Sequence, residues 1–159
     1  MEKEKLQEFT FRVTQASRSE LIVIMYDIIL TDTQAARAYL AEGKRAEFEK
    51  ELKHAARFLN ELMGSLNYQY ALSYELLSLY SYTNKTLIRA MMQRNAELLD
   101  EVDKVMGKLR EAFAEISAQD TSGPVMRNTE QVYAGLTYGR TSLNESLLDV
   151  SGTKRGFTA

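Results

Sequence analysis

Apolar residues return with the 3.6-residue period of an amphipathic helix in four successive stretches between residues 17 and 118. The two-residue alternation that marks β-strands is absent. Residues that break helices are rare before residue 123, and the only proline of the chain is Pro124. The pattern therefore predicts an all-α fold.

The first of these helices carries a start signal and a stop signal. Ser17 can accept a hydrogen bond from the backbone of Glu20, and the Glu20 carboxylate can reach back to Ser17, which makes a capping box. Gly43 can adopt the left-handed conformation that ends a helix. We expect this helix to run from Ser17 to about Ala41.

Three further helices are expected over about residues 44–66, 72–94 and 96–117. Their connections are short, and short connections place consecutive helices antiparallel. The spacing therefore predicts an up-down four-helix bundle over residues 17–118, preceded by an N-terminal arm, residues 1–16.

The helices 44–66 and 96–117 each have a single apolar face, with charged residues on the opposite side. The apolar positions are Phe48, Leu52, Ala55, Leu59, Leu62 and Leu66 in the former, and Leu98, Val102, Val105, Leu109, Ala112 and Ile116 in the latter.

The helices 17–41 and 72–94 carry apolar residues on two sides instead. At 100° per residue, the second apolar side consists of Ile22, Val23, Tyr26 and Leu30 in the former helix, and of Tyr74, Leu77, Ile88 and Met92 in the latter. A helix of a four-helix bundle offers only one face to the core. These residues need other cover, because each large apolar side chain gains roughly 1.5–3 kcal/mol when it is fully buried.

Three kinds of cover fit this pattern. The N-terminal arm or the tail of the same chain can pack on the second sides, or the helix 17–41 can simply be central. A second copy of the chain can cover them in a homodimer. A helix of a client protein can lie in the groove. The three interpretations do not exclude one another.

The C-terminal tail, residues 119–159, is too polar for a core helix and too apolar for a purely solvating segment. We expect it to be partly ordered, with room for a short helix. Within the segment 130–150, four apolar residues are candidate anchors that would hold the tail in the groove until a client arrives: Tyr133, Leu136, Leu143 and Leu147.

Composition excludes several classes of function. The 159 residues include no cysteine, so there are no disulfides, thiolate metal sites or cysteine nucleophiles. The formal net charge is −2 and no basic stripe for nucleic acid is present. The longest apolar run, residues 21–30 with Asp27 inside it, is too short to cross a bilayer, and the N-terminus has no apolar signal segment. We expect a cytoplasmic protein without nucleic-acid binding or membrane insertion.

No constellation of catalytic or metal-binding residues is found. The single histidine, His54, makes one Glu-x-x-His motif with Glu51, whereas di-iron bundles need two such motifs and further inward carboxylates. The helical wheel places Glu51 and His54 on the wet face of their helix, and no paired core carboxylates are expected. Asp27 is expected at the rim of the core. The sequence predicts that the protein is not an enzyme and holds no metal and no cofactor.

Two segments resemble the signatures of the flagellar export chaperone family (FliS). The first lies in residues 13–30, and the second spans residues 79–113. The matching residues are Ala16, Ser17, Glu20, Leu21, Met25, Tyr26 and Asp27 in the first, and Leu79, Tyr80, Tyr82, Leu87, Ala90, Leu99, Glu101, Val102, Leu109, Arg110 and Ala112 in the second.

This resemblance implies a helical chaperone that binds the C-terminal segment of newly made flagellin. Such a chaperone prevents premature polymerisation and holds flagellin for the flagellar export apparatus. The second apolar sides of the helices 17–41 and 72–94 are then the predicted client surface. The alternative is a homodimeric or regulatory helical module that sequesters another protein.

Overall fold

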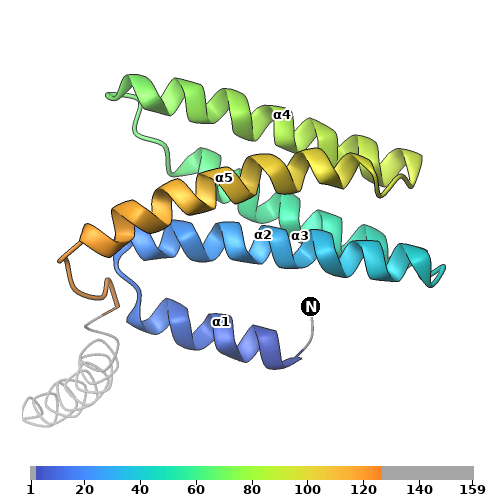
Figure 1. Cartoon of the computed structure of the whole chain (residues 1–159), viewed down its shortest axis with the longest axis horizontal. Coiled ribbons are helices and arrows are strands. Elements are labelled where there is room, and N and C mark those ends of the chain that lie inside the picture. Colours follow the sequence, from blue (N-terminus) through green and yellow to red (C-terminus); the bar gives the residue numbers. More distant parts are fainter. Residues whose placement is uncertain (1–2, 127–159) are drawn as a thin grey trace, which may run out of the picture. The chain divides into compact units, whose positions relative to one another are not determined.

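The computed structural model describes residues 3–126, and these residues form five α-helices and no β-strand (Figure 1). The all-α expectation is confirmed for this part of the chain. No helix in it has the length and apolar character needed to cross a membrane. The helices are α1 (Lys3–Gln15), α2 (Arg18–Ala41), α3 (Arg45–Gly64), α4 (Ala71–Gln93) and α5 (Leu98–Gln119).

Helix α2 begins and ends at the predicted signals. The backbone N–H of Glu20 donates to Ser17 Oγ at 3.3 Å, and the backbone N–H of Ser17 donates to Glu20 Oε2 at 2.8 Å. The capping box is therefore present and satisfies two backbone donors at the start of the helix. Gly43 follows the helix with a φ of 74°, in the left-handed region.

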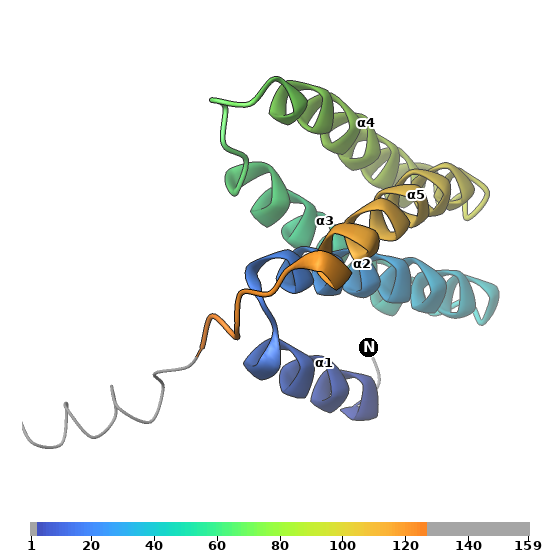
Figure 2. The same ribbon diagram turned by 60° about the vertical axis from the view of Figure 1, so that its left-hand side comes forward.

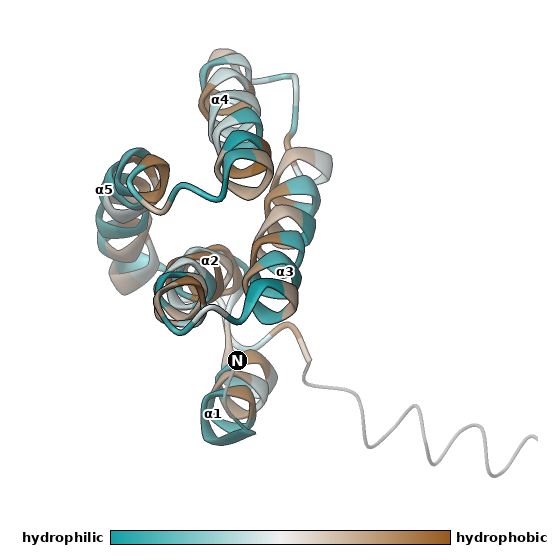
Figure 3. Cartoon of the chain, turned by 90° about the vertical axis from the view of Figure 1, so that its right-hand side faces the viewer, coloured by the Kyte–Doolittle hydropathy of each residue, from teal (hydrophilic) through white to brown (hydrophobic). Residues whose placement is uncertain are grey.

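Helices α2 to α5 surround a common apolar core (Figure 3). Helix α2 packs on α3 and α5, and α4 packs on the same two helices, so α2 and α4 lie diagonally across the core. Figure 1 shows consecutive helices of this group running in opposite directions.

The N-terminal arm forms a helix that the sequence analysis did not predict. Helix α1 lies outside the group of four, against α2 (Figures 2 and 3). Phe9, Val13 and Ala16 pack there with Ile24 and Ile28 of α2. Helix α2 is therefore covered on a further side, in addition to its contacts with α3 and α5.

The apolar face predicted for α3 is confirmed, since five of its residues are buried: Phe48, Leu52, Ala55, Leu59 and Leu62. Leu66 lies beyond the end of the helix and is half-buried.

The face predicted for α5 is partly wrong. Val102 is buried as expected, but the other fully buried residues of the helix are Leu99 and Met106, and Ile116 is 54% exposed. Helix α5 packs on both α2 and α4. These two neighbours together determine which side of α5 is buried. The periodicity of a single helix does not show where its neighbours lie.

Candidate partner-binding surface

An apolar face of α4 points away from the core. Tyr74, Ile88 and Met92 are 58%, 42% and 77% exposed, and Leu77 is half-buried. At 100° per residue, these four positions fall within about 60° of one another on the circumference of the helix. We call this set of residues the outer face of α4. The sequence predicted it, and the described structure leaves it largely uncovered.

A tyrosine before the start of α4, Tyr68, adjoins this exposed apolar surface. Tyr68, Tyr70 and Leu72 are all exposed, and the ring of Tyr68 lies 5.4 Å from the ring of Tyr74, centroid to centroid. Tyrosine provides a large contact area and a hydroxyl for the wet edge of an interface. By contrast, Tyr80 is buried in the core.

The residues predicted on α2 do not join this face. Val23 and Tyr26 are buried, and Ile22 and Leu30 are half-buried. The expected exposed side of α2 is not found at Val23 and Tyr26, because α1, α3 and α5 all pack on this helix. The second apolar side of α2 is therefore covered by other helices of the same chain, which is the first of the three kinds of cover considered from the sequence.

Val23 lines a groove of about 430 Å³ between α1, the start of α2 and the end of α5. Phe11 of α1 and Ala114 of α5 also line the groove, and Phe11 is largely exposed. The sequence analysis missed this groove because it treated residues 1–16 as an arm.

Two tyrosine hydroxyls join α2 to α4 inside the core. Tyr26 and Tyr80 hydrogen-bond to each other through their hydroxyl groups. The ring of Tyr26 also packs on Phe113 of α5, with 5.6 Å between centroids. Burial raises the pKa of Tyr26 well above its usual value, so both hydroxyls remain protonated and one can donate to the other.

Asp27 joins three helices at the edge of the core. Its Oδ1 accepts a hydrogen bond from Arg110 Nε of α5 at 2.8 Å, and its Oδ2 accepts one from Arg12 Nη2 of α1 at 2.7 Å. The carboxylate therefore has a structural role at the rim, where the sequence analysis expected it. A further hydrogen bond joins α4 to α5, from the hydroxyl of Tyr82 to Glu101.

These contacts bring the two signature segments of the sequence together. Tyr26 and Asp27 belong to the first segment, and their partners Tyr80 and Arg110 belong to the second. The family model of the flagellar protein FliS matches residues 2–120, which is well over half of the chain. The chain belongs to the FliS family. No curated protein matches it. Membership implies a role as a flagellar export chaperone, and FliS is a family of chaperones rather than of enzymes.

In this FliS-family chain, several signature residues therefore hold the helices together. Tyr26, Asp27, Tyr80 and Arg110 all make contacts within the chain, and none of them belongs to the outer face of α4. The residues that carry the resemblance to the family thus stabilise the packing of the helices. The exposed apolar surface has to be found from the burial of individual side chains.

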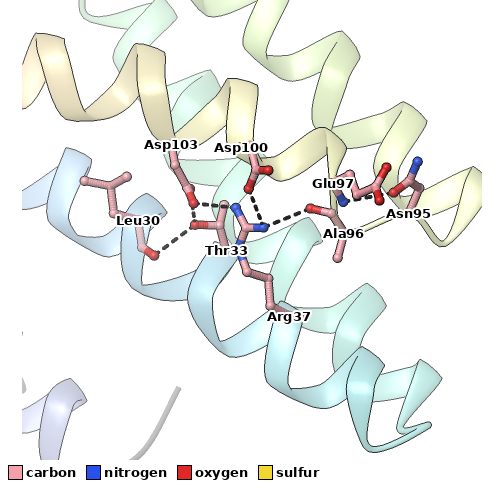
Figure 4. Close-up of polar contacts among 8 residues, drawn as sticks. All are labelled: Leu30, Thr33, Arg37, Asn95, Ala96, Glu97, Asp100 and Asp103. Carbon is pink, nitrogen blue, oxygen red and sulfur yellow. Dashed lines mark hydrogen bonds and ion pairs between the residues drawn. The ribbon is translucent and has the colours of Figure 1, made fainter.

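A second polar junction anchors α5 and the turn before it to α2 (Figure 4). The Arg37 guanidinium contacts Asp103 at 2.6 Å and Asp100 at 2.8 Å, and it donates to the carbonyl of Ala96 at 3.0 Å. The hydroxyl of Thr33 donates to Asp103 at 2.6 Å. Because Arg37 is always charged and its donors form a rigid fork, this arrangement fixes the start of α5 against α2.

The expectations for Glu51 and His54 need correction. Glu51 is only 5% exposed and Asp32 is fully buried beside it, so a pair of core carboxylates exists between α2 and α3. His54 is half-buried and its Nδ1 lies 2.6 Å from Asp32 Oδ2. The helical wheel failed here because the side of α3 that faces α2 is wider than its apolar stripe.

Burial and the neighbouring Glu51 raise the pKa of Asp32 to about 8. Burial also lowers the pKa of His54 below its usual value, against the opposing effect of Glu51. Among residues 3–126, no group of three or more histidine or carboxylate side chains has an arrangement that could hold a metal ion.

The predicted anchors of the tail, Tyr133, Leu136, Leu143 and Leu147, lie outside the described residues. Their role in covering a groove stays a prediction.

Proposed function

We propose that this FliS-family chain is a cytoplasmic chaperone that binds the C-terminal segment of flagellin on the outer face of α4. It would keep flagellin from polymerising early and hold it for the flagellar export apparatus. The observation that carries this proposal is the exposure of Tyr74, Ile88 and Met92 on one side of a long helix. A flagellar export chaperone needs such a surface for an apolar client.

The spacing of these residues suits a helical client. Residues 74, 77, 88 and 92 of α4 repeat at intervals compatible with the helical period, so their side chains form a stripe along the helix axis. A client helix that lies along this stripe can bury its own apolar face there. The exposed Tyr68, whose ring lies beside that of Tyr74, lengthens the contact beyond the start of α4.

The border of the outer face carries basic residues. Lys85 and Arg89 are exposed and lie next to the stripe on the helical wheel. Interfaces usually surround an apolar centre with a polar rim. Carboxylates of the client helix can pair with these two residues and fix its position along α4.

The scaffold for this surface would be an antiparallel four-helix bundle of α2–α5. Its tyrosine pair and the Asp27 and Arg37 junctions tie α4 and α5 to α2. A rigid support lowers the entropic cost of binding, because the client alone then has to become ordered.

Calorimetry with a peptide of the flagellin C-terminal segment tests the proposal. We expect saturable binding with a clearly negative heat-capacity change, because apolar surface is buried as the client orders. Absence of binding by the folded chain would contradict the proposal. If the chain instead sediments as a dimer and ignores flagellin, the homodimeric or regulatory alternative is favoured.

We further propose that the tail competes with the client, through the four anchors named above. Removing residues 127–159 should then tighten flagellin binding, because the free chain no longer spends part of its time in a capped state. The affinity of the truncated chain is measured by the same calorimetry. Equal or weaker binding after truncation would show that the tail does not cap the surface.

A further inference from the structure

The exposed surface of α4 changes its charge along the helix axis. The only acidic residue of the helix, Glu75, lies near its start and beside Tyr74 in the sequence, whereas Lys85 and Arg89 lie in the second half. Arg94 follows directly after the helix, and all three cations are exposed. The surface that we propose for the client therefore has a basic end, which we define as Lys85, Arg89 and Arg94.

The dipole of α4 itself does not explain this placement. Cations stabilise the C-terminal end of a helix, but the effect fades beyond the last turn. The last turn of α4 holds no basic residue, and Lys85 lies roughly two turns before the final residue, Gln93. Of the three cations, Arg94 alone is next to the last carbonyl groups. The positions of Lys85 and Arg89 need another reason.

No carboxylate among residues 3–126 lies within ion-pair distance of the basic end of α4. Two acidic side chains of the neighbouring α5 have other partners. Glu101 accepts a hydrogen bond from the hydroxyl of Tyr82, and Asp100 pairs with Arg37 at 2.8 Å. The basic end of α4 can therefore bind a carboxylate from another molecule without breaking an ion pair of the described chain.

A helical client has two unlike ends. Its first backbone N–H groups carry a partial positive charge and its last C=O groups a partial negative charge, so cations are favoured at its C-terminal end. The C-terminal segment of flagellin adds a full negative charge there, because the polypeptide ends in an α-carboxylate. The basic end of α4 attracts this end of the client and repels the other.

We infer that the last helix of the flagellin segment lies parallel to α4, with its terminal carboxylate at the basic end of α4 and its first turn beside Tyr74. This inference rests on the proposed function and adds the direction of the client. From Tyr74 to Ile88 the helix rises by roughly 21 Å, so a client helix of about 14 residues spans the outer face. A reversed helix would place its N-terminal amides against Lys85 and Arg89, and its carboxylate near Glu75.

The same charges give the surface a preference for a chain end over an internal helix. An internal segment of equal sequence lacks the terminal carboxylate and continues past the basic end of α4. Pairs of exposed charges contribute little to affinity, so we expect a preference of about two- to five-fold. Salt screens such pairs, and the preference should disappear at high ionic strength.

Spin labels at the two ends of α4 test the direction. The chain has no cysteine, so Ala71→Cys or Gln93→Cys carries a single nitroxide label, and both positions are exposed and outside the outer face. They lie roughly 33 Å apart along the helix. The label at position 93 should broaden the NMR signals of the C-terminal end of the bound flagellin peptide. The label at position 71 should broaden those of its N-terminal end.

The possible results separate the direction from the proposed function. The opposite pattern, or equal broadening of both ends by each label, would overturn the direction and leave the proposed function intact. A peptide that binds without broadening from either label would contradict both. Absence of binding, which calorimetry with the unlabelled chain detects, would also contradict both.

Calorimetry with an amidated peptide tests the charge. Amidation removes the α-carboxylate and should weaken binding to the wild-type chain by about two- to five-fold at low salt. The double variant Lys85→Gln/Arg89→Gln should bind the amide and the free acid alike. Lys108→Gln, at an exposed lysine of α5, is the matched control and should retain the difference. Equal affinity of the wild-type chain for the two peptides would overturn the inference.

Discussion

Ile88→Asp should weaken the binding of the flagellin segment by about 30-fold or more. Ile88 belongs to the outer face of α4, and its replacement removes roughly 2 kcal/mol of apolar burial in the complex. The new carboxylate also has to be desolvated against an apolar client, which adds to the loss. Calorimetry of the two proteins with the same peptide gives the ratio directly.

The chain offers a matched control for this substitution. Ile116 of α5 is also exposed, at 54%, and lies outside the outer face of α4. Ile116→Asp should bind flagellin like the wild type, and both variants should unfold within about 0.5 kcal/mol of it, as is usual for exposed positions. Equal affinities of Ile88→Asp and Ile116→Asp would exclude the outer face of α4 as the client surface.

Tyr26→Phe should reduce the free energy of unfolding by about 1–3 kcal/mol without a matching loss of affinity for flagellin. The substitution removes one hydroxyl and leaves the Tyr80 hydroxyl buried without its partner. Chemical denaturation measures the change, and Tyr70→Phe, at an exposed tyrosine, is the control that should have little effect.

Tyr26→Phe also distinguishes a structural role of Tyr26 in the core from a role in binding the client. Tyr26 is a residue that the sequence analysis placed on the client surface, whereas the structure places it in the core. A double-mutant cycle with Tyr80→Phe should show strong coupling, because the two hydroxyls share one hydrogen bond. A stable Tyr26→Phe variant that no longer binds flagellin would return this residue to the client surface.

The sequence predicted the helices of the fold well where the signal is local. The capping box at Ser17 and the left-handed Gly43 mark the ends of α2, because both act through the backbone of a few neighbouring residues. The prediction of the buried residues of α3 was also correct, because a helix with a single apolar stripe can bury only that stripe in the core. The resemblance to FliS was confirmed by the family match over residues 2–120.

The candidate surface was harder to predict, because periodicity shows which sides of a helix are apolar and not what covers them. Helices α2 and α4 looked alike in the sequence. Yet α1 covers a side of α2, and no described helix covers the outer face of α4. A signal for α1 was present in Phe9, Val13 and Ala16, whose spacing of four and three is that of an amphipathic helix.

The buried carboxylates were missed for a similar reason. Glu51 is charged and was therefore assigned to the wet side of α3, as most glutamates are. Its burial depends on Asp32 and His54, which come together only when α2 and α3 pack. Contacts between helices of this kind cannot be derived from the pattern of either helix alone.

Photo-cross-linking from α4 tests most directly the claim that flagellin binds on the outer face of this helix. A photoreactive amino acid is placed at position 92, the most exposed residue of the outer face, and in a second protein at position 53, an exposed site on α3. The account predicts cross-links to the flagellin C-terminal segment from position 92 and none from position 53. Cross-links from position 53 alone, or from neither position while flagellin is bound, would contradict it.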